Sequence, residues 1–384
     1  MNKTTALKGE YAMTERERIL SVYYGETPDR TPFMLDLSHY YYHRFQKDWD
    51  LCYGYHEPER DLIDFNRKMG AGFYMPNQAV FFRTDYDNDI RSAAEKKIED
   101  GSPVITWRFE TPVGTIERKR VWMPGSYSWA IKKWGVEDEK DLEVLKYAMG
   151  HRRFTALPEN YNAWAGYVGD DGLLYLPAGY SAMGYLLHYW MGVENTVYAA
   201  ADMEEELEDC VRAINENNLE MIDMLASRFD APVIVMGDNF SSEMQPPSFF
   251  ARWSKDYYTR AIEIIHSYGK KAAVHIDGKL RYAIQMIKET GADAIDAVTP
   301  GSVGGYTPSE CRKEAGKELI LSGGIPNELW YDYSPMEKFE AAVKDWLSLK
   351  EESTALIAAA GDQVPPGAEE AKILRMGELV REFG

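Results

Sequence analysis

Two apolar runs far apart in the chain end in residues that could do chemistry. The segment KAAVHIDG carries His275 and Asp277 at the end of one run, and Asp362 follows a second run at 353–360. An imidazole with carboxylates can bind zinc or another divalent metal, and the same groups can act as acid and base without a metal. A lone His-x-Asp pattern also occurs as a structural hydrogen-bonded pair, so its meaning depends on where the fold places it.

Further acidic residues accompany neighbouring apolar runs. Asp238 follows the run before KAAVHIDG, Asp296 lies in the run after it, and Asp36 follows the first predicted strand. In folds built from repeating strands and helices, residues at the carboxyl ends of different strands meet at one rim, where such folds do chemistry. We therefore predict that His275, Asp238 and Asp36 are catalytic.

Aromatic and amide side chains also follow predicted strands. Aromatic rings at such a rim suit a flat or a cationic ligand, through stacking and cation–π contacts. The alternatives are tyrosines that pack an amphipathic helix onto the core, and a contact between two subunits. The predicted substrate-binding residues are His39, Tyr180, Tyr185, His188 and Asn239.

The elements that must position these residues alternate between apolar runs and amphipathic helical patterns. Buried parallel strands consist of short, continuous apolar runs. The connection from one strand through a helix to the next parallel strand is right-handed. Eight such runs predict an α/β fold, a (β/α)8 TIM barrel. They are 31–37, 71–75, 173–177, 232–236, 272–276, 293–298, 318–321 and 354–359.

One region does not show this alternation of apolar runs and helical patterns. The stretches 104–110 and 114–123 alternate polar and apolar residues on either side of Thr111, Pro112 and Val113. This pattern predicts an antiparallel hairpin, inserted after the second strand within about 80–150 and overhanging the barrel mouth. The whole chain, 1–384, is predicted to form a single domain.

Composition limits the possible functions. The chain has 384 residues and a net charge of −19, which disfavours binding to nucleic acids and anionic membranes. No apolar stretch has the length of a membrane span and the start lacks the apolar core of a signal peptide, so we expect a cytoplasmic protein. Cys52, Cys210 and Cys311 form no CxxC pair, so they predict neither a disulfide framework nor a cysteine zinc cluster.

Several familiar catalytic motifs are missing from the sequence. It contains no GxGxxG after a first strand, no GxxxxGK[ST] phosphate loop, no HExxH and no GxSxG. Nucleotide-dependent chemistry and serine hydrolysis are therefore disfavoured.

Several blocks together resemble the uroporphyrinogen decarboxylase superfamily, which contains decarboxylases of haem synthesis and cobalamin-related methyltransferases. The blocks are TERERILSVYYGETPDRTPF, LPAGYSAMGYLLHYWMGVENT, TGADAIDAVTP and GDQVPP. The resemblance covers nearly the whole chain except the insertion. It implies a (β/α)8 barrel and a homodimer.

Two local differences favour the methyltransferase branch. The decarboxylases carry an arginine-rich motif soon after the first strand, whereas this chain reads LSHYYYHRFQK, with only Arg44 and Lys47 nearby. A polyanionic tetrapyrrole needs concentrated positive charge. In the methyltransferases, zinc is bound by a His-x-Cys and a distant Cys. The resemblance implies His275, Asp277 and Asp362 as metal ligands at those positions.

The resemblance therefore implies a corrinoid-dependent methyltransferase of the O-demethylase kind. It would move a methyl group from a small O- or N-methyl substrate to a corrinoid carried by a partner protein. Zinc, or a protonated acid, would activate the heteroatom that leaves. One alternative is a decarboxylase of tetrapyrrole metabolism in which Asp36 stabilises a protonated pyrrole. A second is a barrel that binds a ligand without catalysis.

Overall fold

Six parallel strands form the main sheet of the computed structural model, which describes residues 12–384. The strands are β7 (Leu176–Pro177), β8 (Val233–Phe240), β9 (Lys271–Ile276), β10 (Ala294–Val298), β11 (Ile320–Ile325) and β12 (Leu356–Ala360). Their order in the sheet follows their order in the chain, from β7 at one edge to β12 at the other. Each strand therefore pairs with the next one along the chain, as repeated strand and helix units require.

Two short extended segments, around Phe33 and around Gly72, lie between the edge strands β12 and β7, and Gly172 just before β7 pairs with the second of them. Isolated parallel bridges pair Phe33 with Ala358, Met34 with Gly72, and Phe73 with Gly172. The backbones of Gly172 and Phe73 lie very close together. A Cβ atom added to Gly172 would lie only 2.1 Å from the carbonyl oxygen of Phe73, so only glycine fits there. The predicted strands at 31–37 and 71–75 thus exist only as bridges. With them, eight parallel segments follow one another in barrel order, and the predicted α/β barrel class is confirmed.

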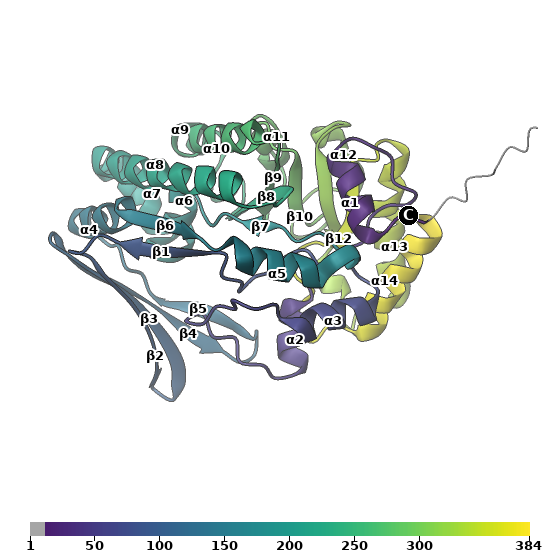
Figure 1. Ribbon diagram of the computed structural model, residues 1–384, viewed down its shortest axis with the longest axis horizontal. Coiled ribbons are helices and arrows are strands. Elements are labelled where there is room, and N and C mark those ends of the chain that lie inside the picture. Colours follow the sequence, from purple (N-terminus) through teal and green to yellow (C-terminus); the bar gives the residue numbers. More distant parts are fainter. Residues whose placement is uncertain (1–11) are drawn as a thin grey trace, which may run out of the picture.

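Helices cover the outer face of the strands (Figure 1). The amphipathic helical patterns between the predicted strands of the second half form helices, among them α8 (Glu204–Arg228), α10 (Lys255–Ser267), α11 (Ala283–Lys288) and α13 (Met336–Ser348). No helix within residues 12–384 is long and apolar enough to cross a membrane. The helices are α1 (Glu15–Tyr23), α2 (Ser38–Arg44), α3 (Arg60–Met69), α4 (Glu139–Gly150), α5 (Pro158–Val168), α6 (Ala182–Tyr185), α7 (Gly192–Asp202), α8 (Glu204–Arg228), α9 (Pro247–Trp253), α10 (Lys255–Ser267), α11 (Ala283–Lys288), α12 (Pro308–Ala315), α13 (Met336–Ser348) and α14 (Glu370–Phe383).

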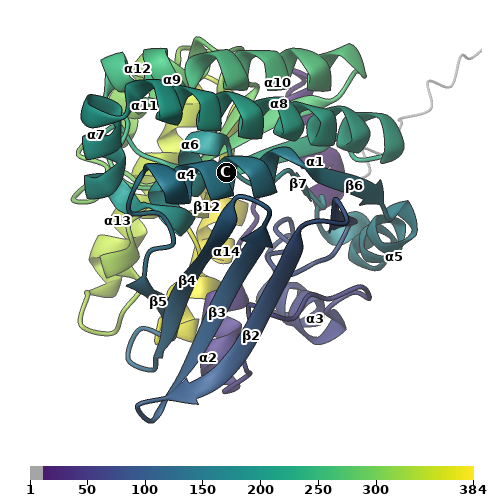
Figure 2. The same ribbon diagram turned by 90° about the vertical axis from the view of Figure 1, so that its left-hand side faces the viewer.

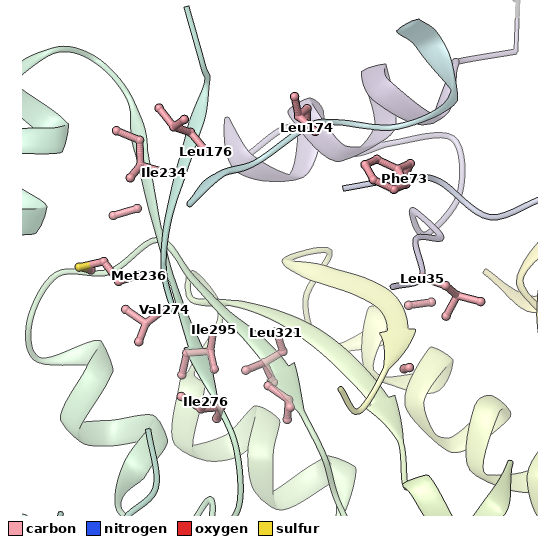
Figure 3. Close-up of a cluster of buried hydrophobic side chains, with 14 of the residues drawn as sticks. Leu35, Phe73, Leu174, Leu176, Ile234, Met236, Val274, Ile276, Ile295 and Leu321 are labelled. Carbon is pink, nitrogen blue, oxygen red and sulfur yellow. The ribbon is translucent and has the colours of Figure 1, made fainter. Parts of the chain in front are cut away.

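The two faces of the strands have different roles. Side chains such as Ile234, Val274 and Ile295 belong to the large core cluster between strands and helices (Figure 3). Alternate residues point into the barrel, where Ala273 and Ala294 belong to a separate buried cluster with residues of α1. Because side chains alternate along a strand, residues two positions after Ala273 and Ala294 also face the interior. These residues are His275 and Asp296.

The insertion is larger than the predicted hairpin. It contains β1 (Phe82–Tyr86), β2 (Arg91–Glu99), β3 (Ser102–Thr111), β4 (Gly114–Met123) and β5 (Ser128–Lys133), and it is followed by α4 and by β6 (Arg152–Ala156). The predicted hairpin is confirmed as β3 and β4, with Thr111 opposite Gly114. Strands β2 and β5 extend it to a four-stranded antiparallel sheet, shown face-on in Figure 2, while β1 pairs with β6.

The four-stranded sheet contacts loops that follow barrel strands. The indole nitrogen of Trp129 on β5 donates to the carbonyl oxygen of Trp49 at 2.6 Å. Arg120 Nη2 on β4 donates to the carbonyl oxygen of His188 at 2.9 Å. These contacts place the insertion over the carboxyl ends of the barrel strands, as the sequence predicts.

Candidate active site

A cavity of about 360 Å³ lies at the carboxyl ends of the barrel strands. No lysine or arginine is among the residues that line it. Its lining combines one imidazole with carboxylates, amides and aromatic rings, which come from the ends of strands, or from the loops after them, at six strand positions of the barrel. The side chains that could act on or orient a ligand are Asp36, Trp49, Tyr74, Asn77, Tyr180, Tyr189, Asn239, His275, Asp362 and Gln363.

His275 and Asp296 form the core of this site. They sit at paired positions of β9 and β10, and His275 Nδ1 lies 2.9 Å from Asp296 Oδ2. Asp296 is almost completely buried, and Ser322 Oγ donates to its other oxygen at 3.2 Å. Burial alone would lower the pKa of His275, but the hydrogen bond to Asp296 and the charges of Asp296, Asp362 and Asp277 raise it to about 9. The imidazole is therefore positively charged at neutral pH.

Asp362 faces the other nitrogen of the ring. Its Oδ1 lies 3.7 Å from His275 Nε2, and both side chains line the cavity. Burial raises the pKa of Asp362 to about 6, against the lowering effect of His275, and Asp277 and Asp36 raise it further. Groups with shifted pKa values that face a cavity are typical of active sites. His275 and Asp362 can thus exchange a proton with a ligand bound between them.

The predicted metal ligands do not gather into a three-ligand set. Asp277 comes after the end of β9, is exposed and does not line the cavity. One nitrogen of His275 is already bound to Asp296. Within residues 12–384, no group of three or more histidine, cysteine, aspartate or glutamate side chains could hold a metal ion. This arrangement does not fit a zinc site formed by His275, Asp277 and Asp362, and zinc binding stays a prediction.

Asp36 lines the cavity with both carboxylate oxygens already hydrogen-bonded. Oδ1 accepts from the backbone and the hydroxyl of Ser38, at 2.9 and 2.6 Å. Oδ2 accepts from Asn77 Nδ2 at 2.6 Å and from Gln363 Nε2 at 3.2 Å. All of these donors are neutral groups, and through two of them Asp36 orients the amides of Asn77 and Gln363 at the cavity wall. Its predicted catalytic role remains untested.

Asp238 lies behind the cavity wall and does not line it. It is fully buried, Oδ1 accepts from the backbone of Ser181 at 2.5 Å, and Oδ2 accepts from the hydroxyl of Tyr258. Burial raises the pKa of its carboxyl group, although these hydrogen bonds oppose the rise. In this position Asp238 anchors the start of α6 to β8. Its neighbour Asn239 does line the cavity, with a left-handed φ of 45° at an irregularity of β8.

The predicted aromatic residues divide between the cavity wall and a layer behind it. Tyr180 lines the cavity, as does Tyr189, whose ring centroid is 4.8 Å from that of Tyr180. Tyr185 and His188 do not line it but pack against Tyr180, at 5.7 and 6.0 Å between centroids. His188 and Tyr189 belong to a π-helical segment, Leu186–Trp190. Such segments are rare and are frequent at functional sites.

His39 on α2 is positioned away from the cavity. Its Nε2 lies 3.1 and 3.0 Å from the carbonyl oxygens of Ser126 and Tyr127 in the insertion. Burial lowers its pKa, although the same backbone contacts oppose this. Its ring packs edge-on against Trp49, which lines the cavity. His39 therefore connects the insertion to the barrel and supports a lining residue.

The sequence reasoning missed several lining residues. Asn77 and Gln78 follow the predicted strand at 71–75 and could have been found by the same strand-end argument. Gln363 is adjacent to Asp362 and could have been found in the same way. Trp49 reaches the cavity through a long loop, and no sequence signal indicates this.

Comparison with known proteins identifies the family. The family model of uroporphyrinogen decarboxylase (URO-D) matches residues 178–383. The chain belongs to this family. A methyltransferase from Methanosarcina mazei has a similar structure to this URO-D family member, with a TM-score of 0.62 and 13% identity over 97% of this chain and 99% of that one.

That similarity shows a common fold over 97% of the URO-D chain. A D-psicose 3-epimerase from Clostridium cellulolyticum H10, solved with D-tagatose, covers 59% of this chain and 81% of its own, at 11% identity and a TM-score of 0.31. This value is too low to support an inference. No curated protein sequence matches the URO-D chain.

Proposed function

We propose that this URO-D family member moves a methyl group from a small O- or N-methyl substrate to a corrinoid carried by a partner protein. The bond between the methyl carbon and the heteroatom breaks, and its electron pair stays on the heteroatom. The reduced corrinoid, as methyl acceptor, supplies the electron pair of the new bond to carbon. For an ether, the leaving oxygen must then gain a proton.

The observation that carries this proposal is the environment of His275. Its Nδ1 is fixed by Asp296, which leaves Nε2 directed at the cavity and at Asp362. A raised pKa keeps the imidazole protonated at neutral pH. His275 can therefore donate a proton to the leaving heteroatom, as a general acid placed by its neighbour does in other enzymes. Afterwards the carboxylate of Asp362 can take up a proton from solvent and pass it to the ring.

The family and the structural match support this choice. The methyltransferase from Methanosarcina mazei is covered over 99% of its length. Because the residues present do not fit a zinc site, the proton donor replaces the metal in this scheme. A cytoplasmic location and a homodimer remain predictions. The small molecule and the corrinoid protein are the proposed partners.

The alternative of a tetrapyrrole decarboxylase has less support. Arg44 is paired with Glu370 at 3.0 Å, and Lys47 with Asp61 at 3.4 Å. No lysine or arginine lines the cavity itself, so its wall lacks the positive charge on several sides that a tetrapyrrole with many carboxylates needs.

One experiment separates the three candidate functions. The purified protein is incubated with reduced free cobalamin and with methyl ethers or methylamines, and methylation of the corrinoid is followed by absorbance. The proposal predicts methylated corrinoid and demethylated donor in equal amounts. Turnover of uroporphyrinogen instead would support the decarboxylase, and tight ligand binding without any turnover would support the non-catalytic barrel. Elemental analysis of the same sample tests for zinc.

A further inference from the structure

Two arginines lie on the face of β4 that is directed at the aromatic wall. Arg118 is only 7% exposed, and its guanidinium carbon lies 3.9 Å from the ring centroid of Trp107, 5.0 Å from that of Tyr189 and 5.2 Å from that of Trp190. Arg120 follows two positions later, on the same face of the strand. The proposed catalytic steps use neither residue.

These two cations lack an anionic partner. Nε and Nη1 of Arg118 and Nε of Arg120 are buried without a hydrogen-bond partner. Within the described part of the chain, no carboxylate forms an ion pair with either guanidinium group, whereas Lys119, between them on the opposite face, pairs with Glu99 at 2.8 Å. Burial and the charge of Arg120 lower the pKa of Arg118 to about 9. An unpaired buried charge is costly, so a ligand that neutralises it gains affinity.

Both arginines touch the wall of the cavity. Arg120 lies 4.8 Å above the ring of Tyr189, the same ring that Arg118 contacts and that lines the cavity. Arg120 also donates to the carbonyl oxygen of His188, in the π-helical segment that carries Tyr189. Neither arginine lines the cavity itself, and both stack on the ring of Tyr189, so of the groups a cavity ligand can carry, a carboxylate at the edge of this ring would lie nearest to them.

We propose that Arg118 and Arg120 form a subsite that binds a carboxylate of the methyl donor, beside the ring of Tyr189. This inference rests on the proposed methyl transfer and narrows its substrate to a flat methyl ether that carries an acid group. The rings of Trp49, Tyr74, Tyr180 and Tyr189 in the lining suit a planar molecule. The ether end is placed at His275, because the leaving oxygen needs the proton described above. Guanidinium groups bind carboxylates through charge-assisted hydrogen bonds.

Calorimetric binding to the full chain tests the subsite without requiring turnover. The ligands are para-methoxybenzoate and the neutral para-methoxybenzyl alcohol, which share the ring and the ether. The variants are Arg118→Met and Arg120→Gln. Arg108→Gln is the matched control, because Arg108 is exposed on the neighbouring strand and pairs with Glu110 at 3.0 Å.

We expect wild type to bind the acid about tenfold more tightly than the alcohol, and each test variant to lose about tenfold in affinity for the acid alone. The control should change neither affinity. Equal affinities of wild type for the two ligands, or equal losses for both ligands in the variants, would overturn the subsite. Arg118→Met should melt no lower than wild type, since it removes an unpaired buried charge. A much lower melting temperature with an unchanged preference for the acid would show a structural role and also overturn it.

Two further ligands show whether the arginines bind the carboxylate of the substrate or another anionic group. Inorganic phosphate and free cobalamin are titrated into the same proteins. If cobalamin depends on the two arginines and para-methoxybenzoate does not, the arginines serve the methyl acceptor and the substrate subsite is wrong. If binding of the acid depends on them but no methyl donor is turned over, the subsite stands and the proposed methyl transfer fails.

Discussion

His275 Nδ1 lies 2.9 Å from Asp296 Oδ2, and the two residues sit at paired positions of the neighbouring parallel strands β9 and β10. The register of a sheet, and not a loop, therefore fixes the orientation of the imidazole. The same register leaves Nε2 pointing at Asp362. Rigid strands can hold such a pair more precisely than loops do.

Asp296→Asn should weaken catalysis through His275. A neutral amide cannot favour the charged imidazole, so the pKa of His275 should fall, and kcat should drop by about 100-fold or more. The alkaline limb of the pH profile should move to lower pH, with little change in KM. Ser322→Ala, which removes the weaker contact to Asp296, is the milder control. An alkaline limb that stays in place would show that Asp296 does not act on His275.

The methyl-transfer rate should have a bell-shaped dependence on pH. Burial opposes the charged form of His275, yet the hydrogen bond to Asp296 raises its pKa to about 9, so the donor loses its proton above that pH. Burial raises the pKa of Asp362 to about 6, so its carboxylate is lost below that pH. We expect kcat/KM to be highest between these values, which belong to the coupled pair. Asp362→Asn should remove the acidic limb, and a wild-type profile flat across this range would contradict the assignment.

Gly184→Ala should disturb the support behind the cavity. A Cβ atom there would lie 2.5 Å from Asp238 Oδ1, which cannot move easily because Ser181 and Tyr258 hold the carboxylate. We expect a loss of about 1–3 kcal/mol in the free energy of unfolding, measured by urea denaturation. Gly166→Ala is the matched control.

Gly166 lies in α5, is exposed and has nothing within 4 Å of an added Cβ atom. That substitution should stabilise the protein by about 0.5–1 kcal/mol, because alanine is the better helix former. Equal effects of the two substitutions would mean that the packing around Asp238 adapts at no cost.

Glu59 should make stability depend on pH. Burial raises its pKa to about 7, although the hydrogen bond from Tyr42 opposes the rise. Unfolded, it titrates near its ordinary value of 4.5. The stabilising contribution is therefore largest below 4.5 and is lost as the pH rises to about 7. Glu59→Gln should flatten this part of the stability curve, whereas Glu57→Gln, at an exposed position, should not; equal curves for all three proteins would refute the shift.

Much of the fold could be predicted because buried strands and amphipathic helices leave a periodic pattern. The strands β8 to β12 and the hairpin of β3 and β4 lie where apolar runs or alternation indicate them. The segments around Phe33 and Gly72 were predicted as strands, but they pair only through isolated bridges, since their length depends on contacts distant in sequence. The polar β2, exposed along almost its whole length, carries no such pattern.

The site was predictable only where strand ends determine it. His275 and Asp296 come together because strand alternation and register place them, and Asp362 joins them from the turn that follows β12. Asp277 also follows a strand end but is exposed and does not line the cavity, a difference that the strand pattern does not predict. Asp238 is turned behind the wall at an irregularity of β8, which no sequence pattern reveals.

The central claim is that His275 donates the proton to the leaving heteroatom. Single-turnover methylation of reduced cobalamin by a methyl ether, followed by absorbance at neutral pH, tests it most directly in wild type and in His275→Gln. We expect wild type to transfer the methyl group and the variant, with unchanged affinity for the ether, to be slower by about 100-fold to 10,000-fold. A variant that transfers the methyl group at the wild-type rate would contradict the claim.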